Sequence, residues 1–146
     1  MKKIRVVAVG KLKEKYWSEA VKEYEKRISR FAEFTIKEID ERRTLQEEGK
    51  DILQNLKGYV IVCDVGGELI TSEGLSETIE KAFLRGNSEV TFVIGSSEGL
   101  AEEVKAKADK RVSFGRVTFP HQMMRVILCE QVYRAMTISN GVTYHK

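Results

Sequence analysis

The feature of this sequence that most constrains its fold is a regular alternation of short apolar runs with longer segments of helical periodicity. The apolar runs are Ile4–Val9, Phe34–Ile39, Tyr59–Cys63, Val90–Ile94 and Arg111–Phe114. Strands that alternate with helices form α/β sheets, and a chain of 146 residues fits one domain. We therefore expect an α/β fold with a mostly parallel sheet, helices on both faces, and a single domain over residues 1–146.

Local signals place the helices and the middle of this sheet. Tyr16–Phe31 repeats apolar residues at the spacing of one helix face. Thr44, with Glu47 three residues later, has the pattern of a capping box, and we expect Ser72 to cap the following helix. Val90–Ile94 (VTFVI) is the most apolar run, so we predict that it lies at the centre of the sheet.

The charge balance and hydropathy argue against a membrane-spanning protein. With 25 Lys and Arg against 22 Asp and Glu, the formal net charge is +3, which permits a nucleic-acid partner without requiring one. No apolar run approaches the roughly 20 residues that cross a bilayer. We expect a cytoplasmic protein with no membrane partner.

The two cysteines, Cys63 and Cys129, each lie within an apolar run and are expected to be buried, reduced thiols. Neither has a second cysteine or a histidine at the spacing of a metal site. The sequence therefore predicts no bound metal.

Three loops directly follow expected strands: Asp64–Gly67, Gly95–Gly99 and Gly115–Pro120. Ligands of α/β sheets usually bind beyond the carboxyl ends of the strands, so these loops are the candidate binding site. The loop GSSEG at Gly95–Gly99 has neither the GxGxxG nor the GxxxxGK[ST] fingerprint. Taken alone, it is compatible with a plain tight turn or with a ligand loop.

Both histidines lie outside the apolar runs. His121 follows Pro120 at the expected start of a helix, where the helix dipole disfavours a protonated ring. Taken alone, it is either a surface or capping residue or part of a site. His145 belongs to the terminal tripeptide Tyr144-His145-Lys146. Chain ends are usually frayed, but two rings and a cation together suit contact with a base and a phosphate.

The final helix is expected to run from Pro120, in its first turn, to about Ser139. Its sequence is apolar over more than one stripe, which indicates burial on two sides. Such a helix is either the core helix of a monomer or lies between the sheet and a partner surface. Of these two interpretations we favour a homodimer.

The loop Lys11–Lys15 is the best candidate for contact with RNA phosphates. Its three lysines directly follow the first expected strand, and Tyr16-Trp17 adds aromatic rings that can contact bases.

Longer stretches of the chain resemble a known family. The stretch TFPHQMMRVILCEQVYRAMTISNGVTYHK closely resembles the carboxyl-terminal signature of the ribosomal RNA large-subunit methyltransferase H family, whose members are minimal SPOUT methyltransferases. VIGSSEGL is similar to the family's IGGxxGL loop, and CDVGGELITSEGL is similar to its LDxxGxxxSSExxA segment. The amino-terminal IRVVAVGK also fits, so the resemblance covers essentially the whole chain.

This resemblance implies a SPOUT-type fold with a carboxyl-terminal trefoil knot, in which the chain end threads a loop to form the cofactor site. Ordinary topology rules favour an unknotted sheet instead. The resemblance also implies a homodimer and S-adenosylmethionine as the methyl donor. The implied reaction is N3 methylation of a pseudouridine in helix 69 of the 23S rRNA, on the assembled ribosome.

Carried over residue by residue, the resemblance implies two groups of site residues. The cofactor is expected to contact the three strand-end loops, and polar side chains of the final helix and the tail are expected around the substrate. The cofactor residues are Cys63, Gly95, Ser96, Gly115, Arg116, Val117, Thr118, Phe119 and Pro120, and the catalytic or substrate residues are His121, Arg125, Tyr144, His145 and Lys146.

The chain departs from the family pattern at three places. Ser96 replaces the usual second glycine, which adds a Cβ where backbone must approach closely. Thr143 replaces the proline that commonly precedes Tyr-His, so a less rigid tail is expected. Gly115-Arg116-Val117 is a variant of the family's third loop.

The roles expected for these residues follow from methyl transfer to an imide nitrogen. The sulfonium methyl is already activated, so the enzyme has to align the nucleophile and handle one proton. We expect His145 or His121 to accept or relay this proton. Arg125 and Lys146 are expected to stabilise negative charge or to hold a phosphate, and Tyr144 to stack on the base.

Three other functions are open at this point. The first two are methylation of another RNA, including a transfer RNA, and a non-catalytic ribosome-binding module. A generic nucleotide-binding domain is disfavoured because both phosphate-loop fingerprints are absent.

Overall fold

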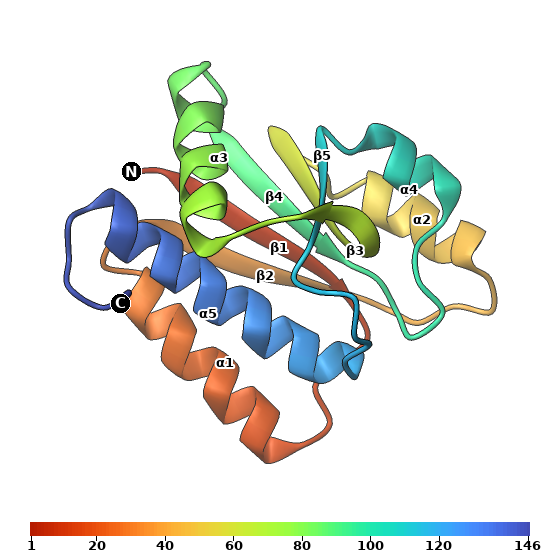
Figure 1. Ribbon diagram of the computed structural model, residues 1–146. Helices are drawn as coiled ribbons and strands as arrows, with labels where there is room; N and C mark the ends of the chain where they lie inside the picture. Colours follow the sequence, from red (N-terminus) through yellow and green to blue (C-terminus); the bar gives the residue numbers. More distant parts are fainter.

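The computed structural model describes residues 1–146, in which five strands alternate with five helices (Figure 1). The strands are β1 (Lys3–Val9), β2 (Glu33–Ile39), β3 (Tyr59–Leu69), β4 (Glu89–Ile94) and β5 (Lys110–Ser113). The helices are α1 (Lys15–Ile28), α2 (Leu45–Leu53), α3 (Ser72–Leu84), α4 (Glu102–Lys107) and α5 (His121–Ser139). The strands form one sheet in the order β2-β1-β4-β3-β5.

Helices cover both faces of the sheet (Figure 1). On one face α1, α3 and α5 enclose the larger core, which includes Ile4, Phe92 and Leu128. On the other face α2 and α4 enclose a smaller core around Val93 and Val104. The prediction of an α/β sheet with helices on both faces is confirmed, and the sheet is parallel throughout rather than mostly parallel. The trefoil knot stays a prediction.

Strand β4 lies at the centre of the sheet, as its apolar sequence predicted. It pairs with β1 on one side and with β3 on the other, and Val90–Ile94 is buried throughout. Thr91 is the one polar residue in this stretch. Its hydroxyl donates to the Lys57 carbonyl at 2.6 Å and accepts from the Lys57 N–H at 3.3 Å, so the buried polar group is satisfied.

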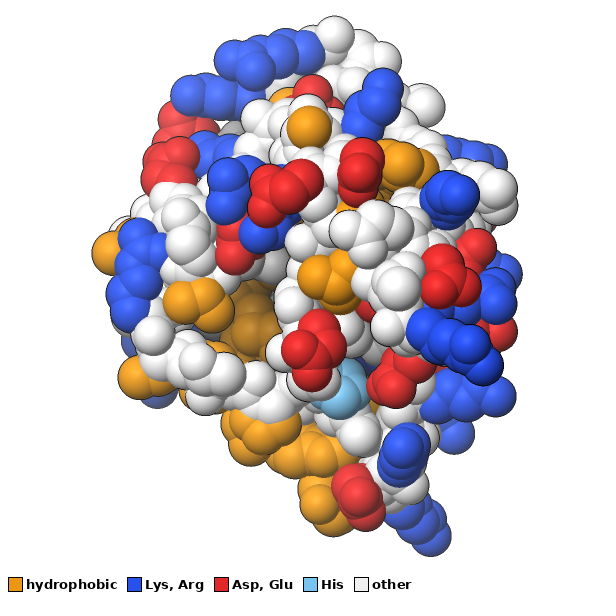
Figure 2. Space-filling view, turned by 90° about the vertical axis from the view of Figure 1, so that its right-hand side faces the viewer, with side chains coloured by type: hydrophobic (Ala, Val, Ile, Leu, Met, Phe, Trp, Pro, Cys, Tyr) orange, Lys and Arg blue, Asp and Glu red, His pale blue; other side chains and the backbone are white.

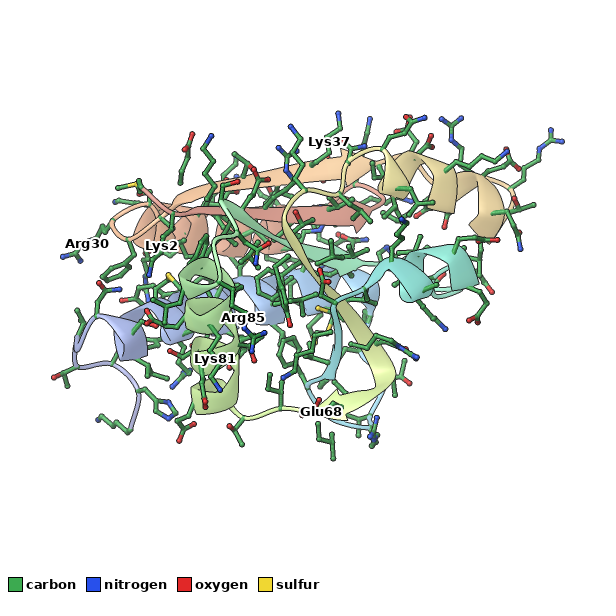
Figure 3. All side chains as sticks on the ribbon, turned by 90° about the horizontal axis from the view of Figure 1, so that it is seen from above. Lys2, Arg30, Lys37, Glu68, Lys81 and Arg85 are labelled. Carbon is green, nitrogen blue, oxygen red and sulfur yellow. The ribbon has the colours of Figure 1, made fainter.

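Strand β2 forms one edge of the sheet and shows the alternation predicted for a half-buried strand. Phe34 and Ile36 pack against the larger core. Lys37, which follows Ile36, is exposed and extends outward from the strand (Figure 3).

Strand β3 is longer than predicted, because the expected loop Asp64–Gly67 lies within the strand. After Cys63 the strand bulges and then returns, so that Glu68–Leu69 also pairs with β5. The backbone of Gly67 approaches β5 so closely that a Cβ there would lie 2.8 Å from the carbonyl carbon of Arg111. Gly66 and Gly67, which indicated a turn, therefore lie in a bulge, and Gly67 allows the close contact with β5.

The cap of α2 matches its prediction, whereas the cap of α3 does not. The Thr44 Oγ1 accepts a hydrogen bond from the N–H of Glu47 at 3.1 Å. Helix α3 is capped by Thr71, whose Oγ1 accepts from the N–H of Gly74 at 2.9 Å. Ser72, which we expected as the cap, is the first helical residue, and its hydroxyl donates to a side chain of α5.

One end each of α1 and α5 differs from the prediction made from the spacing of apolar residues and the position of Pro120. Helix α1 ends at Ile28, and Phe31 lies in the following turn, where its N–H donates to the Ile28 carbonyl at 2.8 Å. This turn keeps Phe31 against the core, so its spacing looked helical. Pro120 is the residue directly before α5, which begins at His121. No helix in the structure is both long and apolar enough to cross a membrane.

Gly67→Ala should destabilise the protein by about 1–3 kcal/mol, because overpacking against β5 forces backbone shifts. Its Cβ would lie 2.8 Å from the Arg111 carbonyl carbon and 2.9 Å from the Val112 nitrogen. Gly66→Ala is the matched control: no atom lies nearer than 3.9 Å to its Cβ, so its effect should stay within about 0.5 kcal/mol. Urea unfolding followed by circular dichroism measures both values. Equal free energies of unfolding would contradict the close contact at Gly67.

Candidate functional site

A pocket of about 540 Å³ opens at the bulge of β3 and at the carboxyl ends of β4 and β5. All three strand-end segments singled out from the sequence contribute to its walls. Figure 2 shows this side of the molecule, where hydrophobic side chains are recessed beside a histidine. Of the nine residues predicted to contact the cofactor, eight line the pocket: Cys63, Gly95, Ser96, Gly115, Val117, Thr118, Phe119 and Pro120.

The loop Gly95–Gly99 folds tightly on itself. The N–H of Gly99 donates to the Ser96 carbonyl at 2.9 Å, and the N–H of Glu98 donates to the Ser96 hydroxyl at 3.3 Å. A Cβ on Gly95 would lie 2.3 Å from the Gly99 carbonyl oxygen, so this position requires glycine. At Ser96 the side chain is accommodated, and its hydroxyl helps to close the turn. The departure from the family pattern therefore falls where the loop tolerates a side chain.

Arg116 is the one predicted cofactor residue that does not line the pocket. Its guanidinium donates to the carbonyl of Val65 and, at 3.0 Å, to that of Gly67. These bonds tie the loop Gly115–Pro120 to the bulge of β3. The Arg116 side chain thus joins two walls of the pocket without lining it.

Asp64 places a fixed negative charge on the pocket wall. Arg111 donates to it from Nε at 3.2 Å and from Nη2, and the N–H of Gly66 donates at 3.2 Å. Burial raises the pKa of Asp64, but these hydrogen bonds outweigh burial and hold the pKa below its ordinary value. No group of three or more His, Cys, Asp or Glu side chains is arranged to hold a metal ion.

Much of the remaining wall is apolar, and Lys105 is the one lysine on it. Burial, with a smaller contribution from Asp64, raises the pKa of the Cys63 thiol to about 12, so the thiol is neutral at physiological pH. Five core side chains also reach the pocket and were missed by the sequence analysis: Ile94, Leu100, Val112, Phe114 and Met124. Their one sequence signal is that they flank the three loops. An apolar wall with a few polar groups is typical of a site for a small organic ligand.

His121 is the one predicted catalytic residue that lines the pocket. It is the first residue of α5, and its ring lies near the end of β1, where a Cβ on Gly10 would be 3.7 Å from its Nε2. The N–H of Lys13 donates to the side chain of the next residue, Gln122, at 2.9 Å. The start of α5 and the loop after β1 therefore meet at the pocket.

Arg125 lies one turn further along α5 and is only 1% exposed. Its Nη1 donates to Glu38 of β2 at 2.6 Å, and its Nη2 donates to the Gly10 carbonyl at 3.0 Å. The Nε has no partner, although it is buried. The guanidinium joins α5 to the ends of β1 and β2 and does not line the pocket. These contacts fit a positioning residue that acts through the start of α5.

The chain tail lies beside the second half of α5, at the end of the helix away from the pocket of the same chain (Figure 1). The Tyr144 hydroxyl donates to Glu130 at 2.8 Å, and its ring packs edge-on against Tyr133 at 4.7 Å between centroids. Burial and the bond to Glu130 raise the pKa of Tyr144 to about 12, so the phenol keeps its proton. Glu130 is nine residues after His121, about 14 Å along the helix.

His145 is held between two charged side chains. Its Nδ1 lies 3.1 Å from Nη1 of Arg134, and its Nε2 lies 3.3 Å from Glu73. Since a guanidinium can only donate, these contacts fit a ring that accepts at Nδ1 and carries its proton on Nε2. Lys146 is exposed. Within one chain the structure therefore brings His121 to the pocket, Arg125 beneath it, and the three tail residues elsewhere.

Comparison with known proteins shows to which family this chain belongs. A family model described as predicted SPOUT methyltransferase matches residues 1–145. The ribosomal RNA large subunit methyltransferase H proteins of Streptococcus pneumoniae strains CGSP14 and TIGR4 are each 46% identical over an alignment 158 positions long, which covers 99% of both chains.

Two solved structures resemble the fold at low sequence identity. A probable methylase family protein from Haemophilus influenzae has a TM-score of 0.59 at 12% identity, covering 99% of this chain and 71% of its own. The tRNA (m1G37) methyltransferase of Aquifex aeolicus has a TM-score of 0.58 at 13% identity, covering 99% of this chain and 74% of its own. The family-model match over residues 1–145 and the 46% identity to these relatives show that the chain is a SPOUT methyltransferase and belongs to the ribosomal RNA large subunit methyltransferase H family.

Proposed function

We propose that this protein transfers a methyl group from S-adenosylmethionine to N3 of a pseudouridine in helix 69 of the 23S rRNA, acting on the assembled ribosome in the cytoplasm. The observation that carries the proposal is the pocket that the three motif-bearing loops build at the strand ends. The ribosomal RNA target is supported by the names of relatives that match over 99% of both chains.

The residues of the pocket fit this methyl donor. Its volume of about 540 Å³ lies within the roughly 300–1,000 Å³ of ordinary ligand pockets. Leu100 and Phe114 offer apolar surface for a flat ring, and the close turn at Gly95 leaves backbone groups accessible. The donor supplies an activated sulfonium methyl group when bound.

His121 is the group best placed to take the imide proton from the base, because it alone among the predicted catalytic residues lines the pocket. A general base in hydrogen-bonding reach contributes roughly 10²- to 10⁴-fold to the rate of such a step. Arg125 holds the start of α5 on β1 and β2 and so keeps His121 in position.

In this proposal the tail of one chain contributes to the pocket of a second copy of the chain, not to its own pocket. Within one chain Tyr144 and His145 are bonded to α5 and α3 side chains, and their contacts on α5 begin about 14 Å along the helix from His121. In a dimer, the tail of one chain can lie at the pocket of its partner, so the distance within one chain no longer matters. His145 is then the second candidate for proton relay, and Lys146 the candidate for phosphate contact.

We place the dimer contact on the outward side of α5. Its flanks are covered by α1 and α3 of the same chain, which accounts for much of its apolar sequence. Met123, Val126 and Ile127 follow one another on the side turned away from the sheet and stay partly exposed. This strip adjoins His121, so a second copy packed on it brings another chain close to the pocket.

The substrate proposal predicts a defined product. With methyl-labelled S-adenosylmethionine, the purified protein should label 23S rRNA in assembled ribosomes that lack the modification, and mass mapping should place the methyl in helix 69. Free transfer RNA is the control substrate and should stay unlabelled. Label in transfer RNA alone would favour the alternative RNA target. Donor binding without any transfer would favour a ribosome-binding module.

Gly95→Ala should weaken S-adenosylmethionine binding about tenfold or more, because strain of 1–3 kcal/mol is expected from overpacking the loop. Its Cβ would lie 2.3 Å from the Gly99 oxygen and 2.8 Å from Leu100 Cγ. Glu98→Gln is the matched control in the same loop: Glu98 is exposed and does not line the pocket, so the affinity should stay within about twofold. Calorimetric titration compares the two, and equal affinities would remove this loop from the donor site.

Two inactive variants should regain activity when they are combined. Deletion of Tyr144–Lys146 removes the tail, and His121→Ala removes the proposed base from the pocket. After joint refolding in equal amounts, roughly a quarter of the sites should recover in single-turnover methylation, because half of the dimers are mixed and each of these has one complete site. No recovery would contradict a shared site. Full activity of the tail deletion alone would show that the tail has no catalytic role.

A further inference from the structure

The segment Lys11–Lys15, which follows β1 and ends at the first residue of α1, is called the basic loop, and hydrogen bonds fix its position. Gly10 turns the chain at the end of β1 with φ +93°, and its N–H donates to the Ile39 carbonyl at 2.7 Å. Its own carbonyl accepts from the buried guanidinium of Arg125 at 3.0 Å. The N–H of Lys13 donates to Gln122 of α5 at 2.9 Å. These bonds hold the basic loop next to the start of α5, where His121 lines the pocket.

The lysine side chains of the basic loop are largely free of carboxylate partners. Lys11 and Lys13 are exposed, and neither forms an ion pair within 4.0 Å. Lys15 has one long contact with Glu19 at 3.7 Å, and both of these side chains are well exposed, so this pair neutralises little of the charge. The basic loop therefore presents positive charge to solvent beside the pocket.

The cations around α3 differ in this respect. Lys81 pairs with Glu77 at 2.7 Å, and Lys2 pairs with Glu80 at 3.4 Å. Figure 3 shows Lys2, Lys81 and Arg85 in the region of α3. Because α3 carries three glutamates, Glu73, Glu77 and Glu80, against one lysine, that surface is the weaker candidate for an anionic partner.

An aromatic side chain extends the surface of the basic loop. Tyr16 follows it directly and is 62% exposed, which is unusual for a large ring. Its orientation is supported by Trp17, whose ring meets it edge-on at 4.8 Å between centroids. An exposed ring beside free cations suits a nucleic acid, whose bases stack on aromatics while its phosphates pair with cations.

We infer that the basic loop, through Lys11 and Lys13, binds phosphates of the RNA strand next to the nucleotide that enters the pocket, and that Tyr16 contacts a neighbouring base. This inference rests on the proposed function and names the part of the RNA that is held outside the pocket. Two cations that release counterions from the RNA supply affinity without reading sequence. The nucleotide in the pocket is selected separately.

The test compares two double variants that remove the same charge. Lys11→Gln with Lys13→Gln changes the basic loop, and Lys22→Gln with Lys26→Gln changes two exposed, unpaired lysines further along α1. Binding to ribosomes lacking the modification is measured over a range of salt concentrations. The basic-loop variant should lower the slope of log K against log salt by about 1.4–1.8, and should bind about 25- to 60-fold more weakly at 0.1 M salt. The α1 variant should keep the wild-type slope.

Two further measurements separate this inference from the proposed function. Both double variants should bind S-adenosylmethionine like the wild type, because none of these lysines lines the pocket. If the wild type methylates ribosomes but the basic-loop variant keeps the wild-type slope, or both variants lose slope equally, the inference is overturned and the proposed function stands. If the wild type methylates no ribosomal RNA, the proposed function falls and this inference falls with it.

Discussion

The parallel pairing of β3, β4 and β5 is the constraint on which the rest of the site depends. Strands that run the same way present their carboxyl ends at one edge, so the segments after Cys63, Ile94 and Ser113 open on the same side of the sheet. The conformations of the loop residues determine the shape of the pocket at this edge. The required glycine at Gly95 and the φ of +137° at Gly115 then shape the walls of a pocket whose position the sheet has already set.

Arginines fix these walls while their side chains stay outside the pocket. Arg111 holds Asp64, Arg116 joins the third loop to the bulge of β3, and Arg125 joins α5 to β1 and β2. A guanidinium suits this work because its five donors can bridge several acceptors at once. The pocket can therefore stay largely apolar, with Asp64, Lys105 and His121 as its acidic and basic side chains, while the three arginines outside it set its shape.

The sequence was most informative where structure depends on local pattern. The five strands, the central place of Val90–Ile94 and the two loops Gly95–Gly99 and Gly115–Pro120 all follow from apolar runs and glycine positions. The continuation of β3 could not be read in this way, because Glu68–Leu69 is a strand only through its pairing with β5. The guanidinium contacts of Arg116 and Arg125 were missed for the same reason: which distant carbonyl or carboxylate a guanidinium meets is a property of the fold. The resemblance to the family supplied the candidate site residues, but it did not show that His121 lines the pocket while Tyr144–Lys146 of the same chain lie away from it.

The buried guanidinium of Arg125 also has a consequence for how the molecule opens. It links α5 to Glu38, 87 residues earlier, and to the end of β1. Unwinding the first turns of α5 alone would leave this charge without partners in a low-dielectric interior, which is strongly unfavourable. The amino-terminal β1–α1–β2 unit and the first half of the last helix should therefore exchange their amide hydrogens as one cooperative unit, although they are opposite ends of the chain.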